Sequence, residues 1–250
     1  MRICFISDTH RQHPDLPEAD LLVHCGDLTT LGTRNQFEKE ADWLERIIPR
    51  FKHGMLFVPG NHDLGLDSKF ISRELGAYNK DPYHHHAPPW SYADTELIEF
   101  MMTKLGITIL KDQATQIAGI KFYGSPYTSI FFDWGFMETE LQLSARWNKI
   151  PQDTQVLITH SPPKYILDHC QNGNVGSDSL ARRVKDLPAL KVHAFGHIHE
   201  PGGESRVMWN KLFINAATVG GYNSGGFFNP INVVDTETWE ICEIFDERGL

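Results

Sequence analysis

The sequence predicts a single α/β domain that covers residues 1–250. Short apolar runs alternate with longer segments whose apolar residues recur at helical spacing, as strands and helices do when they alternate along a chain. Several of the apolar runs end directly in a carboxylate, an amide or an imidazole. The chain has no internal repeat, low-complexity tract or linker that would divide it. A chain of this length buries a large core, so one α/β domain accounts for it.

The N-terminal half begins with three predicted strands, at residues 2–7, 21–25 and 55–58. Between the second and third strands, residues 33–48 predict a helix, because their apolar side chains fall on one face. Thr33 can cap the start of this helix, and Pro49 prevents its continuation. Residues 81–90 contain three prolines and therefore predict irregular chain.

The remaining elements continue the same alternation. Further helices are predicted near residues 68–76, 94–105, 138–148 and 178–187, and further strands near 107–110, 115–123, 155–159, 191–195 and 212–216. Residues 231–245 alternate in polarity like a hairpin that turns at 235–238. Residues 125–136 form a loop rich in Phe, Tyr and Trp, which we call the aromatic loop.

Polar side chains follow five of the predicted strands, at the points where these strands end. The carboxyl ends of parallel strands gather at one edge of an open α/β sheet, where ligands bind. Residues far apart in the sequence are therefore expected to meet in one pocket. Carboxylate oxygens and imidazole nitrogens are ligands for Zn, Mn or Fe. Seven candidate ligands are too many for one ion, so we expect two ions; the seven are Asp8, His10, Asp27, Asn61, His160, His197 and His199.

These residues occur in five motifs that resemble those of the calcineurin-like metallophosphoesterases. The motifs are Asp8-Thr9-His10, Gly26-Asp27, Gly60-Asn61-His62-Asp63, the isolated His160 and Gly196-His197-Ile198-His199, in the order that this family has. The resemblance covers about residues 1–235 and is nearest to the metallophosphoesterase-domain-containing subgroup, typified by brain-expressed phosphodiesterases. It implies a four-layer α/β/β/α sandwich, in which two packed mixed sheets are flanked by helices.

The resemblance also implies a role for each site residue. The first metal would be held by Asp8, His10, Asp27 and His199, and the second by Asp27, Asn61, His160 and His197. Asp27 would bridge the two ions, and a metal-bound hydroxide would attack phosphorus. His62 would donate a proton to the leaving group without being a ligand, and Asp63 would orient its imidazole.

The implied activity is a metal-dependent phosphodiesterase acting on small phosphodiester or nucleotide substrates, with cyclic nucleotides among the candidates. Related protein phosphatases carry arginines in the motifs G-D-x-x-x-R-G and R-G-N-H, where this chain has Leu31 and Pro59. Those arginines clamp the dianionic phosphate of a monoester, so their absence favours diesters. The alternatives are a phosphomonoesterase, protein phosphatase or nuclease on the same site, or a non-catalytic metal-binding scaffold. We expect two Mn²⁺ ions, with Fe, Zn, Ni and Co as alternatives.

Charge, hydropathy and cysteine content limit the classes of partner and the compartment that we expect. The formal net charge of −9 argues against a protein that binds duplex nucleic acid through a basic surface. The chain starts inside a predicted strand and has no long apolar run, so neither a signal peptide nor a membrane partner is expected.

Cys4 and Cys25 lie in apolar runs and are expected to be buried thiols. Four cysteines without paired spacing suit a reducing cytoplasm.

Three sets of residues have two explanations in the sequence. His84, His85 and His86 form a tract of a kind that binds metals, but a solvated loop is the simpler explanation. His24 and His193 lie inside predicted strands, and we expect them in the core or behind the ligands. The aromatic loop provides either core side chains or a wall against which a base or aryl group stacks; its residues in question are Phe131, Phe132, Trp134 and Phe136.

Overall fold

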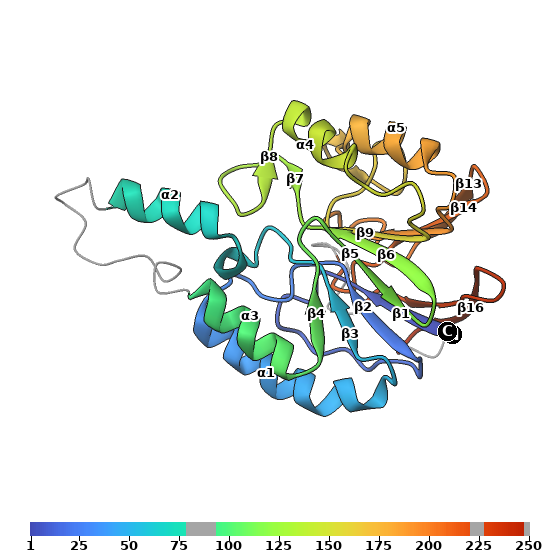
Figure 1. The fold of residues 1–250 in the computed structure, drawn as a ribbon, viewed down its shortest axis with the longest axis horizontal. Coiled ribbons are helices and arrows are strands. Elements are labelled where there is room, and N and C mark those ends of the chain that lie inside the picture. Colours follow the sequence, from blue (N-terminus) through green and yellow to red (C-terminus); the bar gives the residue numbers. More distant parts are fainter. Residues whose placement is uncertain (79–93, 221–227, 248–250) are drawn as a thin grey trace.

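The computed structural model describes residues 1–78, 94–220 and 228–247, which form two six-stranded sheets and five α-helices (Figure 1). The tract of three histidines lies outside the described residues. The first sheet has the order β16-β15-β1-β2-β3-β4, with β1 (Arg2–Ile6), β2 (Leu21–His24), β3 (Met55–Phe57), β4 (Ile107–Ile109), β15 (Ile231–Asp235) and β16 (Glu240–Phe245). Strands β1 to β4 are parallel, whereas β15 and β16 are antiparallel to their neighbours, so this sheet is mixed.

The second sheet is also mixed. Its order is β13-β14-β12-β9-β6-β5, with β5 (Gln113–Ile117), β6 (Ile120–Ser125), β9 (Val156–Thr159), β12 (Val192–Phe195), β13 (Ser205–Met208) and β14 (Lys211–Asn215). The four central strands are parallel, and the two edge strands are antiparallel to them. Two short ladders join β7 (Thr128–Ser129) to β8 (Met137–Glu138) and β10 (His169–Cys170) to β11 (Gly173–Asn174).

The described residues form five α-helices. They are α1 (Arg34–Ile47), α2 (Ser68–Tyr78), α3 (Thr95–Lys104), α4 (Glu140–Trp147) and α5 (Asp178–Asp186), with short 3₁₀ turns at Ile48–Arg50 and Leu64–Leu66. Figure 1 shows α1 and α3 on one side of the molecule and α4 and α5 on the opposite side, with both sheets between them. The predicted four-layer α/β/β/α sandwich is confirmed.

Side chains along a strand point alternately to the two faces of its sheet. Each sheet therefore has apolar side chains on both faces, and three apolar clusters hold the layers together. On β1, Ile3 and Phe5 point into the cluster between the sheets, where they join residues of the second sheet such as Ile158. Cys4 and Ile6 on the same strand belong to the cluster under α1 and α3. A third cluster lies between the second sheet and helices α4 and α5. Cys4 and Cys25 are fully buried free thiols, as expected.

Local sequence signals explain most element boundaries. The Thr33 side chain accepts a hydrogen bond from Gln36 N and caps α1, and Pro49 lies in the 3₁₀ turn where that helix ends. Thr139 caps α4 through a capping box with Gln142. Among the residues that the structure describes, no helix combines the length and apolar composition needed to cross a membrane.

One predicted strand is wrong. Residues 115–123 are not continuous: β5 and β6 pair antiparallel and are joined by a tight turn at Ala118 and Gly119. Both turn residues have left-handed backbone angles, with φ 49° and 84°. Glycine adopts this conformation freely, but alanine adopts it at a cost, so Ala-Gly is a weak turn signal beside the strong strand propensity around it.

Candidate metal centre

The candidate ligands come together where the central parallel strands of both sheets end. Asp8 follows β1, Asp27 follows β2, and His160 follows β9. Backbone hydrogen bonds tie these strand ends together, since Asp8 N donates to Gly26 O at 2.8 Å and Gly196 N donates to His160 O at 2.9 Å. The site therefore spans the junction of the two sheets, and its geometry follows from the layer packing.

The first group of ligand atoms belongs to Asp8, His10 and His199, which all lie within 4.8 Å of one another. The Nε2 atoms of His10 and His199 are 3.4 Å apart, and His199 Nε2 is 3.3 Å from Asp8 Oδ1. Asp8 Oδ1 is buried and accepts no hydrogen bond from the described part of the chain. A buried carboxylate oxygen of this kind needs a positive partner.

The second group belongs to Asp27, His160 and His197, whose ligand atoms also lie within 4.8 Å of one another. Asn61 joins it, because its Oδ1 is 2.9 Å from His160 Nε2. Asp27 Oδ2 lies 3.5 Å from His160 Nε2 and 3.8 Å from His10 Nε2. Asp27 thus stands between the two groups, and all seven predicted ligands meet in one place.

The donor pattern of the imidazoles fits cations at both groups. His10 Nδ1 donates to Thr29 O at 3.3 Å, and His160 Nδ1 donates to Cys25 O at 3.0 Å. A neutral imidazole that donates from Nδ1 has its lone pair on Nε2. His10 in the first group and His160 in the second therefore present Nε2 lone pairs toward the neighbouring carboxylate of Asp27. Metal-binding histidines have this arrangement, so the two His/Asp groups fit a dinuclear metal centre.

The pKa shifts of Asp27 and His160 in the second group also indicate that a positive charge is stabilised there. Burial disfavours the charged carboxylate of Asp27, but the neighbouring His160, His62 and His10 outweigh it and keep its pKa well below the usual value. Burial lowers the pKa of His160, whereas the charges of Asp27 and Asp8 raise it to about 9. Without a metal ion, an extra proton is thus stabilised at the point where a cation would bind.

Glycines beside the ligands allow the close approach of these segments. A Cβ atom on Gly60 would lie 2.2 Å from Asp27 Oδ1, and one on Gly196 would lie 2.0 Å from Asp8 Oδ2. Both positions therefore require glycine, which explains the Gly in the two motifs. Asp8, Asp27 and His197 have positive φ angles of 52°, 57° and 68°. Strained backbone of this kind is concentrated at functional sites.

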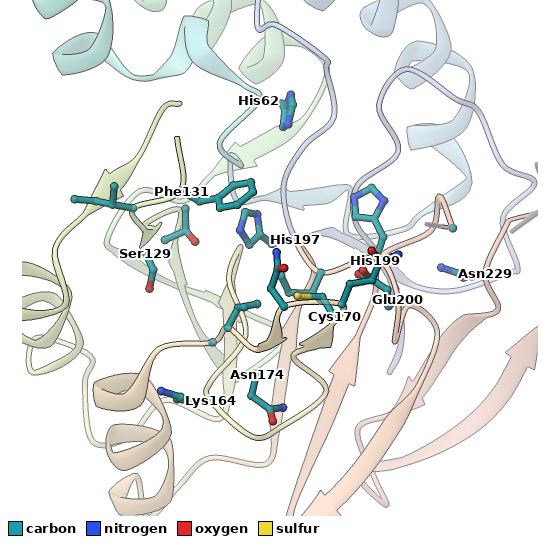
Figure 2. A pocket seen from close by; sticks show the side chains of 18 residues that line it. His62, Ser129, Phe131, Lys164, Cys170, Asn174, His197, His199, Glu200 and Asn229 are labelled. Atoms are coloured by element: carbon teal, nitrogen blue, oxygen red, sulfur yellow. The ribbon is translucent and has the colours of Figure 1, made fainter. Parts of the chain in front are cut away.

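His62 lies beside the ligand groups rather than in them (Figure 2). Its backbone N–H donates to Asp27 Oδ1 at 2.8 Å, and its Nδ1 donates to Thr30 O at 2.8 Å. A carbonyl can only accept, so Nδ1 carries the proton in the neutral ring and Nε2 is the atom left for a substrate.

The expected contact of Asp63 is corrected by the structure. Its carboxylate accepts hydrogen bonds from Gly60 N, Thr29 N and Thr29 Oγ1 at 2.9, 2.9 and 2.8 Å, while Thr30 O, not Asp63, partners the His62 imidazole. Asp63 N also donates to Gly60 O at 3.1 Å in a tight turn. The Asp63 carboxylate therefore contacts Thr29, the residue before the Thr30 whose carbonyl partners His62.

A pocket of about 1160 Å³ opens over the site. His62, His197 and His199 line its inner part, and Phe131 and Asn174 lie on opposite walls (Figure 2). The core explanation is confirmed for Phe136, whereas stacking of a base or aryl group on the loop stays a prediction. Phe136 is buried in the core, Phe131 lines the pocket, and Phe132 is 78% exposed outside its lining.

His24 and His193 lie fully buried behind the ligands. His24 accepts from Gly26 N through Nδ1 and therefore donates from Nε2 to Thr9 Oγ1, at 3.2 and 3.0 Å. His193 Nε2 lies 2.8 Å from Thr159 Oγ1, next to His160. Each imidazole thus contacts a threonine that is next to a candidate ligand in the sequence: Thr9 follows Asp8, and Thr159 precedes His160. The sequence marks the histidines only as buried, because their threonine partners, Thr9 after β1 and Thr159 in β9, lie in other segments of the chain.

His193 predicts an acid-dependent loss of stability. Burial lowers the pKa of His193 to about 3, whereas an unfolded histidine titrates near 6.5. Between these pH values the unfolded chain binds a proton that the native chain does not, so the contribution is present above pH 6.5 and is lost as the pH falls. We expect metal-free wild type to lose about 2 kcal/mol more than His193→Gln between pH 7.5 and 5.0. Urea unfolding of both proteins measures this, and equal losses would contradict it.

Comparison with known proteins identifies the family. Residues 1–201 match the family model described as calcineurin-like phosphoesterase. The chain belongs to the calcineurin-like phosphoesterase family. It is 34% identical over 208 residues to human Metallophosphoesterase domain-containing protein 1, a match that covers 81% of this chain and 61% of the human protein.

Two further relatives of this chain have names that differ from that of the human protein. "Probable rhamnogalacturonate lyase C" of Emericella nidulans is 32% identical over 213 residues, which are 84% of this chain and 18% of that protein. "Probable glycerophosphodiester phosphodiesterase GpdQ" of Arcobacter nitrofigilis is 24% identical over 206 residues, which are 80% of this chain and 63% of that protein. The chain thus spans less than two thirds of the length of each of these three relatives.

Proposed function

We propose that this protein is a dinuclear metal-dependent phosphodiesterase that hydrolyses small phosphodiester or nucleotide substrates, cyclic nucleotides included. Seven candidate ligands around Asp27, with His62 beside them, carry this proposal. The family supplies the phosphoesterase chemistry, and one relative is named as a phosphodiesterase. The mixed set of carboxylate, amide and imidazole ligands supports Mn²⁺, with Fe, Zn, Ni and Co as alternatives.

In this proposal each ligand group would hold one ion, and Asp27 would be available to both. Divalent ions bound there would supply polarisation of the phosphoryl group and an activated water at neutral pH. The Thr29 and Cys25 carbonyls accept hydrogen bonds from Nδ1 of His10 and His160, which leaves the Nε2 atoms of both rings available as ligands. His62 would act as an imidazolium: its Nδ1–H stays bonded to Thr30 O, and its Nε2–H passes to the departing ester oxygen, which leaves the neutral ring.

The preference for diesters rests on the charges that reach the pocket. Among the described residues that line it, Lys164 is the basic side chain, and it already pairs with Asp178 at 3.1 Å. Two arginines considered as possible clamps have acidic neighbours: Arg11 lies 3.4 Å from Glu40, and Arg34 lies 2.7 Å from Glu38. A monoester dianion favours an arginine clamp, which the described lining of this pocket does not include, whereas a diester carries a single negative charge.

The decisive assay compares kcat/KM for bis-p-nitrophenyl phosphate and p-nitrophenyl phosphate, with Mn²⁺ at one pH. We expect the diester to be the better substrate, and cyclic nucleotides and single-stranded nucleic acid extend the panel. A monoester preference of about tenfold, equivalent to about 1.4 kcal/mol, would replace the proposed activity by that of a phosphomonoesterase. Metal-loaded protein that hydrolyses no ester of the panel would favour the non-catalytic scaffold.

A further inference from the structure

The imidazole of His62 is held between two aromatic rings. The ring centroids of His62 and Trp134 are 4.0 Å apart, and the two rings are inclined by 35°. On its edge, His62 meets the ring of His10 at 4.9 Å in a T-shaped contact. The hydrogen bond from Nδ1 to Thr30 O fixes one atom of the ring but leaves the ring able to tilt. At 4.0 Å the Trp134 ring packs against the imidazole and limits such a tilt.

Backbone contacts fix Trp134 relative to His62. Gly135 N donates to Asn61 O at 3.1 Å, which joins the residue after Trp134 to the residue before His62. A Cβ atom on Gly135 would lie 3.3 Å from that same Asn61 oxygen, so the two segments are in close contact. Phe136 N donates to Asp67 Oδ2 at 2.7 Å, and its ring is buried in the core. These bonds hold the backbone that follows Trp134 against the backbone of the candidate ligand Asn61.

We propose that Trp134 is a positioning residue for proton donation by His62. By covering one face of the imidazole, the indole restricts the ring tilt, so that Nε2 keeps its direction toward the leaving group. Misplacing a catalytic group by about 1 Å can cost on the order of 100-fold in rate. An aromatic face also stabilises the positively charged imidazolium that donates the proton. This inference rests on the proposed function, because it assigns Trp134 a task only if His62 is the donor.

The test compares leaving groups. Aryl methyl phosphodiesters with p-nitrophenol and phenol leaving groups differ in their need for a proton, because phenolate departs less readily than p-nitrophenolate. We expect Trp134→Leu to lower kcat by about tenfold for the phenyl ester and by less than about threefold for the p-nitrophenyl ester. Trp134→Phe retains a ring at the same place and is expected to restore most of the rate on the phenyl ester.

Controls separate positioning from folding. Trp209 is 41% exposed, and its ring contacts Phe213 on the second sheet, so Trp209→Leu provides a matched change that should leave both rates unaltered. Metal content and melting temperature are measured on every variant. NMR of the diamagnetic Zn-loaded protein gives a readout without turnover: the His62 Cε1 proton should lie upfield in wild type and move downfield in Trp134→Leu as the indole ring current is lost.

The outcomes distinguish this inference from the proposed function. If wild type and His62→Ala behave as proposed but Trp134→Leu slows both esters equally, Trp134 does not position the proton donor. Unchanged rates in Trp134→Leu would overturn the inference in the same way. If loaded wild type cleaves no diester at all, the proposed function fails and the inference falls with it. Selective loss on the phenyl ester, with metal content unchanged, supports both.

Discussion

Replacing Asp27 by Asn is expected to abolish hydrolysis and to weaken the binding of both metal ions. Asp27 Oδ2 faces His160 of one ligand group and His10 of the other, at 3.5 and 3.8 Å. An amide occupies the same space but supplies no negative charge between two dications. Because the ions supply several kcal/mol of transition-state stabilisation, we expect turnover to fall by at least about 10³-fold.

The Asp27 experiment measures bound metal and diester turnover on the same preparation. Asp42 is exposed on α1, so Asp42→Asn removes one carboxylate charge from the protein without touching the site. This control should bind metal and turn over like wild type. An Asp27→Asn protein that holds two ions tightly and works at the normal rate would disprove the bridging role.

Replacing His62 by Ala is expected to lower turnover by about 10²- to 10⁴-fold, the usual contribution of a positioned proton donor. Its Nε2 is the ring nitrogen left free, because Nδ1 donates to Thr30 O. Metal content should stay near that of wild type, since the His62 side chain belongs to neither ligand group. The contact to Asp27 Oδ1 comes from the backbone N–H of residue 62 and survives the substitution.

For His62→Ala, kcat on the phenyl methyl phosphodiester, whose leaving group needs a proton, is determined together with bound Mn²⁺. His53 lies on the turn before β3, away from the ligands, and His53→Ala is the matched control, with wild-type kcat expected. If the His62→Ala protein is purified without metal and does not bind added Mn²⁺, then His62 is a metal ligand and not a proton donor.

That the candidate ligands meet could be predicted from the sequence because strand ends carry a strong local signal. Asp8 and His160 follow largely apolar strands, and parallel strands end at one edge, so the order of motifs already implies a common site. The helix that starts at Arg34 was likewise predictable, since Thr33 caps it and its apolar face is periodic.

Contacts from side chains to backbone atoms could not be predicted from the sequence. Every residue has a backbone carbonyl, so the residue types do not show which carbonyl a side chain will meet. The partner of His62 is the Thr30 carbonyl, and that of His160 is the Cys25 carbonyl. For the same reason the direct role expected of Asp63 was wrong, since its carboxylate binds backbone N–H groups instead of the ring. Composition marked the aromatic loop as unusual, but only the backbone bond from Gly135 to Asn61 reveals that Trp134 covers His62.

The central claim is that both ligand groups hold an ion and that hydrolysis needs both. Titration of metal-free protein with Mn²⁺ tests this most directly, with bound ion and bis-p-nitrophenyl phosphate turnover recorded at each step. We predict two ions per chain at saturation, and turnover that appears as the second ion binds. Saturation at a single ion per chain with full turnover, or full turnover in the presence of excess chelator, would contradict the account.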